Sequence, residues 1–228
     1  MAIDAVIPAA GIGRRMGSAV PKQYLQLAGK TVLQRTLEIF LNSPLISRVI
    51  VCLKEGDPYF DSLPVSRDPR LIRAPGGAER CDSVLAGLWC SEAEWVMVHD
   101  AARPCLTGGD LRLLAEEAIS RDGGLLCAPV RDTMKRAGED MLIQGTVDRN
   151  GLYHALTPQM FRRTELLQAL EDAASRGLKV TDESSAMELA GCRPLAVAGR
   201  ADNIKITSQG DLELAEFILE GHRRNGIV

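Results

Sequence analysis

The segment "PAAGIGRRMGSAVPKQY", residues 8–24, decides how the fold begins. It follows residues 3–7, a short and mainly apolar run that predicts a buried strand. Three glycines, two adjacent arginines and a lysine then occur in a stretch with neither a helical nor a strand period. Glycines let a backbone approach a ligand closely and point successive N–H groups at one oxygen. The sequence therefore predicts an anion-binding loop after the first strand.

The distribution of charge supports such a loop. The chain has 228 residues and a net charge of −3, so we expect no general attraction to nucleic acid or to membranes. No acidic residue occurs between Asp4 and Glu38. The basic residues of that window are Arg14, Arg15, Lys22, Lys30 and Arg35. Positive charge is thus concentrated around the glycine-rich segment.

Cysteine usage and hydropathy indicate the cellular setting. The six cysteines form no C-x-x-C pair and mostly lie in apolar runs, which predicts reduced core residues in a cytoplasmic protein. No apolar run is long enough to span a membrane, and no signal-like segment opens the chain. We therefore expect a cytoplasmic protein without a membrane partner.

Strand-like and helix-like segments alternate along the chain, whose length fits a single domain over residues 1–228. Further strands are predicted at residues 48–53, 94–99, 124–130 and 193–199, and helices at 79–91 and 183–190. Other helices are expected to begin at Thr31, Asp110, Thr164 and Ser208. The pattern predicts an α/β fold, a Rossmann-like and mostly parallel sheet flanked by helices. Ligands of such sheets bind at the carboxyl ends of the strands.

Residues 131–156 interrupt this alternation. A turn at residues 138–140 separates two extended runs that are too polar for a core hairpin. We expect a protruding β-arm, and because an isolated hairpin is marginally stable in water, we expect the arm to pair with a second copy in a homodimer.

The glycine spacing argues against the best-known nucleotide motifs. Gly11, Gly13 and Gly17 give G-x-G-x-x-x-G, one residue longer than the dinucleotide fingerprint. No acidic residue ends the second predicted strand, and the Walker pattern is absent. A dinucleotide-dependent reductase is therefore disfavoured.

The order of several motifs instead resembles a known family. P-A-A-G-x-G-x-R-M followed by P-K-Q-Y is similar to the signature of sugar-phosphate nucleotidylyltransferases. "HDAARP", "APVRDTMKR", "TVDRNGLYHALTPQ", "TDESSA" and "GRADNIKIT" narrow the resemblance to the 2-C-methyl-D-erythritol 4-phosphate cytidylyltransferases. The resemblance implies transfer of a cytidylyl group from CTP to that polyol phosphate, with Mg²⁺ and release of pyrophosphate, on the non-mevalonate isoprenoid route.

The resemblance also implies a nucleotide site. The residues that would hold the triphosphate are Ala9, Ala10, Gly11, Gly13, Arg15 and Lys22. Arg15 and Lys22 would stabilise the transition state. Those that would contact cytosine are Gly76, Gly77 and Ser83, and Asp100 would serve the ribose and the Mg²⁺.

A second group of residues is implied for the polyol phosphate. Arg103 and Thr133 would bind it, and Arg149 in the arm would reach it in the neighbouring subunit. Thr181 and Asp182 would flank the same pocket, and Lys205 would contact phosphate as a third catalytic cation.

Two alternative functions remain open at this point. The first is the same chemistry on another polyol phosphate, such as ribitol 5-phosphate. The second is a nucleotide-binding regulatory module without catalysis, which the pairing of Arg15 with Lys22 disfavours. A phosphate monoester has a second pKa of about 6 and needs no general base, so His99 is interpreted as a packed strand residue.

Overall fold

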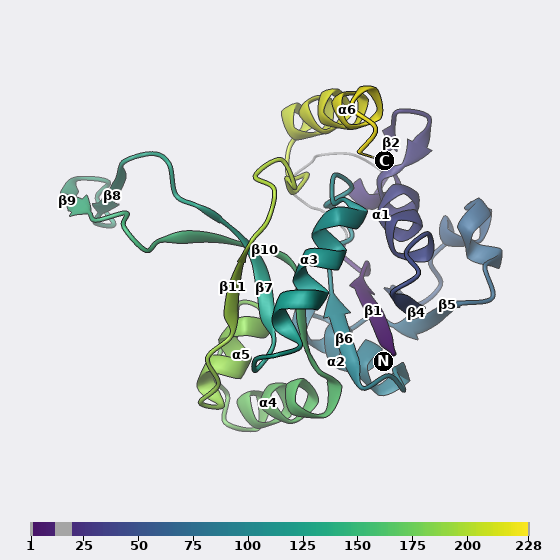
Figure 1. Cartoon of the computed structure of the whole chain (residues 1–228), viewed down its shortest axis with the longest axis horizontal. Coiled ribbons are helices and arrows are strands. Elements are labelled where there is room, and N and C mark those ends of the chain that lie inside the picture. Colours follow the sequence, from purple (N-terminus) through teal and green to yellow (C-terminus); the bar gives the residue numbers. More distant parts are fainter. Residues whose placement is uncertain (1, 12–19, 228) are drawn as a thin grey trace.

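A seven-stranded sheet forms the centre of the computed structural model, which describes residues 2–11 and 20–227 (Figure 1). The strands lie in the order β11-β7-β10-β6-β1-β4-β5. Their bounds are β1 (Ile3–Pro8), β4 (Ile46–Leu53), β5 (Leu71–Pro75), β6 (Trp95–Val98), β7 (Gly124–Pro129), β10 (Tyr153–Arg162) and β11 (Leu195–Ala198). Two short strands, β2 (Gln26–Leu27) and β3 (Lys30–Thr31), form a separate small hairpin.

Strand β10 alone in this sheet runs against its neighbours. It is antiparallel to both β6 and β7, whereas every other neighbouring pair in the sheet is parallel. The predicted α/β fold with a mostly parallel sheet is confirmed. The predicted end of the arm was wrong, because residues 153–156 belong to β10, where Tyr153 pairs with Pro129 and Ala155 with Cys127.

Helices cover both faces of the sheet. They are α1 (Val32–Leu41), α2 (Arg80–Cys90), α3 (Gly108–Ala118), α4 (Arg163–Ser175), α5 (Glu183–Leu189) and α6 (Gln209–Arg224). Successive strand residues point to opposite faces. Accordingly Ile7 packs with the cluster that includes Leu37 of α1 and Leu114 of α3, while Val6 packs with Leu88 of α2 and Leu170 of α4. Burial on both faces explains why β1 is apolar without alternation.

Side-chain caps set several helix starts. Thr31 precedes α1, and its Oγ1 accepts a hydrogen bond of 3.1 Å from Gln34 N, as predicted. Ser208 caps α6 as predicted. The predicted cap of α3 was wrong: Thr107 is the cap and Asp110 the third helical residue of a capping box, with Asp110 Oδ2 accepting from Thr107 N at 3.3 Å.

The predicted β-arm is a hairpin that leaves the body of the molecule (Figure 1). Strand β8 (Met134–Ala137) pairs antiparallel with β9 (Ile143–Val147), and neither belongs to the central sheet. Met141, Leu142 and Ile143 at its tip are 79%, 69% and 62% exposed. Large apolar side chains are therefore presented to solvent at the end of the arm.

Helix α6 lies apart from the layers on the sheet faces, at the top of the view in Figure 1. Its residues Ala215 and Leu219 pack with Leu27, Ala102 and Ile206 in a third apolar cluster. This packing fixes the segment that leads into α6 beside the loop that follows β6. Among the described residues, no helix combines the length and the hydropathy needed to cross a membrane.

Candidate active site

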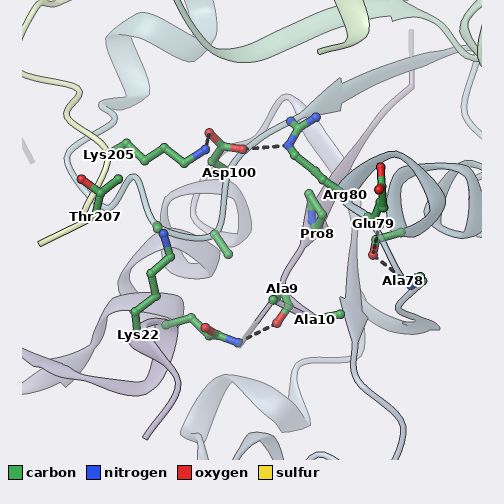
Figure 2. Close-up of a pocket in the computed structure, with 16 residues that line it drawn as sticks. Pro8, Ala9, Ala10, Lys22, Ala78, Glu79, Arg80, Asp100, Lys205 and Thr207 are labelled. Carbon is green, nitrogen blue, oxygen red and sulfur yellow. Dashed lines mark hydrogen bonds and ion pairs between the residues drawn. The ribbon is translucent and has the colours of Figure 1, made fainter. Parts of the chain in front are cut away.

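A cavity of about 400 Å³ opens at the carboxyl ends of β1 and β6 (Figure 2). Its walls come from the loop after β1, the N-terminus of α2, the loop after β6 and the segment before α6. The predicted site residues that line it are Ala9, Ala10, Gly11, Lys22, Gly77, Ser83, Asp100 and Lys205. Residues predicted from motifs far apart in sequence thus meet in one cavity. Gly13 and Arg15 lie outside the described residues.

The loop after β1 is held at both of its described ends. Ala9 N donates to Cys52 O at 2.9 Å, which continues the pairing of β1 with β4. Gln23 Nε2 donates to Ala9 O at 2.7 Å from the short 3-10 helix η2 (Lys22–Tyr24). In the same helix, Lys22 Nζ donates to Ile206 O at 2.9 Å. The Lys22 ammonium is therefore held at the cavity wall.

The turn at residues 76–79 forms the opposite wall. Gly77 N donates to Ser83 Oγ at 3.0 Å, and Ser83 Oγ donates to Glu79 O at 3.2 Å. Ser83 thereby fixes the turn at the N-terminus of α2. Gly76 does not line the cavity, but its N–H donates to Leu53 O at 2.7 Å and seats the turn against β4.

Asp100, just after β6, accepts from three cations. Arg80 Nε lies 3.0 Å from its Oδ1, and Lys205 Nζ and Arg103 Nε lie 2.9 and 3.3 Å from its Oδ2. Figure 2 shows Asp100 between Lys205 and Arg80. Burial alone would raise the pKa of Asp100, but the charges of Arg80 and Lys205 outweigh it and hold the pKa well below its usual range. Asp100 is therefore a carboxylate that fixes the surrounding cations.

Arg103 lies behind Asp100 rather than in the cavity wall. Its Nη1 donates to Asn203 O at 2.7 Å, and the residue is buried. Asn203 Nδ2 in turn donates to Thr157 O at 2.8 Å. In this structure the Arg103 side chain connects Asp100 to the segment that carries Lys205.

The other predicted substrate residues are not brought to this cavity within one chain. Thr133 and Arg149 are exposed at the base of the arm, where Arg149 Nη1 donates to Arg131 O. Thr181 is exposed, and Asp182 caps α5, with Oδ1 accepting from Ser185 N at 3.0 Å.

Two charged residues of the site were missed in the sequence. Arg80 lines the cavity, and its guanidinium forms a two-pronged pair with Glu183, with Nη1–Oε1 of 2.6 Å and Nη2–Oε2 of 3.1 Å. Arg80 lies in the stretch GGAERCDS, residues 76–83, between the predicted cytosine contacts Gly77 and Ser83, and Glu183 lies in the quoted "TDESSA" motif. The position of each residue in such a stretch was the signal that the sequence offered. The pairing of Arg80 with Glu183 depends on the fold and could not be predicted from the sequence.

His99 does not face the cavity. Its Nε2 lies 3.1 Å from Arg103 O and its Nδ1 lies 3.0 Å from Thr157 Oγ1, which suits a neutral ring that donates at Nε2 and accepts at Nδ1. Burial lowers the pKa of His99 to about 4. The sequence predicted a packed residue rather than a base at His99, and the structure agrees.

The loop that begins at Ala9 meets two lysines, Lys22 and Lys205, at the carboxyl ends of a mostly parallel sheet, which is where such sheets bind their ligands. The family model described as 2-C-methyl-D-erythritol 4-phosphate cytidylyltransferase matches residues 3–221. The chain belongs to this family.

Relatives of that name agree with the family assignment. One from Aliivibrio fischeri is 52% identical, over 96% of this chain and 94% of the relative. Another from Aeromonas hydrophila is 54% identical, over 96% and 90%. Among solved structures, the Francisella tularensis enzyme has a TM-score of 0.84 at 33% identity, covering 96% of this chain and 100% of that one. The Thermus thermophilus enzyme has a TM-score of 0.82 at 30% identity, covering 96% and 100%.

Proposed function

We propose that the cavity beside Asp100 is the active site at which this chain transfers a cytidylyl group from CTP to 2-C-methyl-D-erythritol 4-phosphate. The products are the CDP-methylerythritol and pyrophosphate, in the non-mevalonate route to isoprenoid precursors. The observation that carries this proposal is the convergence of Lys22 and Lys205 on one cavity, next to the loop that begins at Ala9. Family membership supplies the identity of the two substrates.

The reaction is a displacement at phosphorus. An oxygen of the polyol phosphate forms a bond to the α-phosphorus of CTP, and the bond from that phosphorus to the bridging oxygen breaks as pyrophosphate leaves. The nucleophile is already ionised at neutral pH, since its second pKa is about 6. The site therefore has to supply alignment and positive charge rather than a general base, which agrees with the inaccessible His99.

Each wall of the cavity has a role in this proposal. The backbone at residues 9–11, with Lys22, holds the triphosphate, and the sequence adds Gly13 and Arg15 to this group. Gly77 and Ser83 read the cytosine edge. Lys205, anchored on Asp100, offers its charge to the phosphates that react.

A divalent cation would have few protein ligands at this site. Within the described part of the chain, no group of three or more His, Cys, Asp or Glu side chains is arranged to hold a metal. Mg²⁺ is commonly bound by one or two carboxylates together with substrate phosphates, and Asp100 would supply the carboxylate here. When bound, the ion would neutralise negative charge on the triphosphate.

We further propose that the active site is shared between two chains. The arm exposes apolar side chains that a second copy would cover, and Arg149 and Thr133 at its base do not line the cavity of their own chain. A two-fold dimer formed through the arms would bring Arg149 to the polyol phosphate bound by the other chain.

A pyrophosphate-release assay over a panel of substrates tests the proposed reaction. We expect release with CTP and methylerythritol phosphate, and much slower release with ribitol 5-phosphate or with UTP or ATP. Equal rates with ribitol 5-phosphate would favour the alternative polyol. Binding of CTP without any release would favour a regulatory module.

All six cysteines are free, which supports the proposal that the protein works in the reducing cytoplasm.

A further inference from the structure

Glu183 is a buried carboxylate that is linked to the cavity by its ion pair with Arg80. Its side chain is 2% exposed, and both its oxygens accept from the guanidinium of Arg80. The Nε of the same guanidinium donates to Asp100 Oδ1 at 3.0 Å. Glu183 does not line the cavity, whereas Arg80 and Asp100 do.

The backbone around Glu183 is fixed from the central sheet. Gln159 of β10 accepts from Ser184 N at 2.7 Å through its Oε1 and donates to Asp182 Oδ2 at 2.9 Å through its Nε2. Glu183 is the first residue of α5, so these bonds hold it on both sides. The position of the Glu183 backbone is thus set by contacts that do not involve Arg80.

Charge balance gives this arrangement a consequence for catalysis. Arg80, Arg103 and Lys205 all approach Asp100, which carries a single negative charge. A bidentate pair is geometrically specific, because the carboxylate accepts from two N–H groups along the edge of the arginine guanidinium. Glu183 therefore holds the Arg80 guanidinium through two bonds, and Lys205, whose side chain is 38% exposed, is the most exposed of the three cations on Asp100.

We propose that Glu183 is a positioning residue for the cytidylyl transfer, acting through Arg80 on Asp100 and so on Lys205. The inference rests on the proposed placement of the active site in this cavity. It predicts an effect mainly on the rate of the bound complex rather than on CTP binding, because Lys205, which Asp100 holds, is the cation proposed to act on the phosphates that react.

Glu183→Gln tests the proposal, since it removes the charge and keeps the shape. We expect kcat to fall about tenfold or more, as for a small misplacement of a reacting group, with the KM for CTP changed by less than about threefold. Glu188→Gln is the matched control: Glu188 lies on the same helix and accepts from Ser184 Oγ at 2.7 Å, and it makes no contact with Arg80. Rates are corrected for the folded fraction.

A double-mutant cycle with Arg80→Gln separates positioning from a purely structural role. If Glu183 acts through Arg80, then Glu183→Gln added to Arg80→Gln leaves kcat within about twofold of Arg80→Gln alone. It should also raise the Tm of that variant, because an unpaired buried carboxylate is removed. Multiplied losses of kcat, or an equal loss in Glu188→Gln, would overturn the proposal.

Glu183→Asp keeps the inference testable if Glu183→Gln does not fold. The shorter carboxylate keeps its charge but cannot reach Arg80 with both oxygens, so we expect an intermediate loss of kcat. Wild-type kcat in Glu183→Asp would contradict the proposal. Failure of the wild type to release pyrophosphate from CTP would instead count against the proposed function, which is read in a separate assay.

Discussion

Gly76 and Ala10 are in contact so close that a Cβ atom on Gly76 would lie 2.1 Å from Ala10 Cβ. The same Cβ would lie 3.0 Å from Leu53 O. The turn proposed to read cytosine is thereby seated directly on the loop proposed to hold the triphosphate. A side chain at residue 76 has to displace the turn or the loop, so under the proposed roles the recognition of the base would be coupled to that of the phosphates.

Gly76→Val is expected to impair both folding and activity. The added side chain meets Ala10 and the backbone of Leu53, so we expect a loss of about 1–3 kcal/mol in the free energy of unfolding and a raised KM for CTP. Urea unfolding and steady-state kinetics measure the two effects. Gly108→Ala is the control, because nothing lies within 4 Å of a Cβ placed there. An unchanged KM for CTP in Gly76→Val would show that residue 76 takes no part in binding the nucleotide.

Lys22→Ala and Lys205→Ala are each expected to lower kcat by ~10²-fold or more, the scale of losing one preorganised charge or donor in a transition state. CTP affinity should fall much less. The sequence gives the same expectation for Arg15→Ala. Lys30→Ala provides a control, since Lys30 forms an exposed ion pair with Glu38 away from the cavity. Near-normal kcat in any one variant would remove that residue from the catalytic group.

His99 is expected to make stability depend on pH between about 6.5 and 4. Its pKa is lowered from 6.5 to about 4 in the folded protein, because burial disfavours the imidazolium. The unfolded chain takes up this proton first as the pH falls. The stabilisation is therefore complete above about pH 6.5 and is lost on descent toward pH 4, by about 3 kcal/mol.

Urea unfolding of wild type and His99→Gln at pH 7.5 and 4.5 measures this term, because glutamine does not titrate. We expect the loss of stability between these pH values to be smaller in His99→Gln. His154→Gln, which replaces an exposed histidine, is the control. An identical pH dependence in wild type and His99→Gln would contradict the assignment.

The sequence predicted those parts of the fold that depend on local pattern. Apolar runs located β1, β4, β6, β7 and β11, and Thr31 and Ser208 were recognised as caps. Strand β10 was not separated from the arm because Thr157, Pro158 and Gln159 interrupt its pattern and no helix precedes it. Asp110 was taken as a cap because it is acidic and precedes an apolar periodicity, whereas the capping box places such a residue three positions into the helix.

The candidate site, like the fold, was predicted only where local motifs specify it. Motifs along the chain led to Lys22, Asp100 and Lys205, which the structure brings together. The pairing of Arg80 with Glu183 joins residues 103 positions apart, and no local pattern specifies such a contact. Asp182, the predicted substrate residue, has a helix-capping position, and its neighbour Glu183 is the one that pairs with the site.

Arg149→Ala is expected to weaken use of the polyol phosphate while CTP binding survives, because Arg149 does not line the cavity of its own chain. Mixing Arg149→Ala chains with Lys22→Ala chains should yield heterodimers with one intact site and activity above either parent. Sedimentation checks that the chains associate. Fully active monomers would refute a shared site, and dimers without recovery would assign Arg149 to its own subunit's pocket.

The transfer itself is tested most directly by following the α-phosphorus of CTP. The wild-type protein is incubated with CTP radiolabelled at that atom, methylerythritol phosphate and Mg²⁺, and the products are separated. The account predicts that the label moves into the CDP-methylerythritol while the pyrophosphate released is unlabelled. Label that stays in CTP, or that passes as readily to ribitol 5-phosphate, would contradict it.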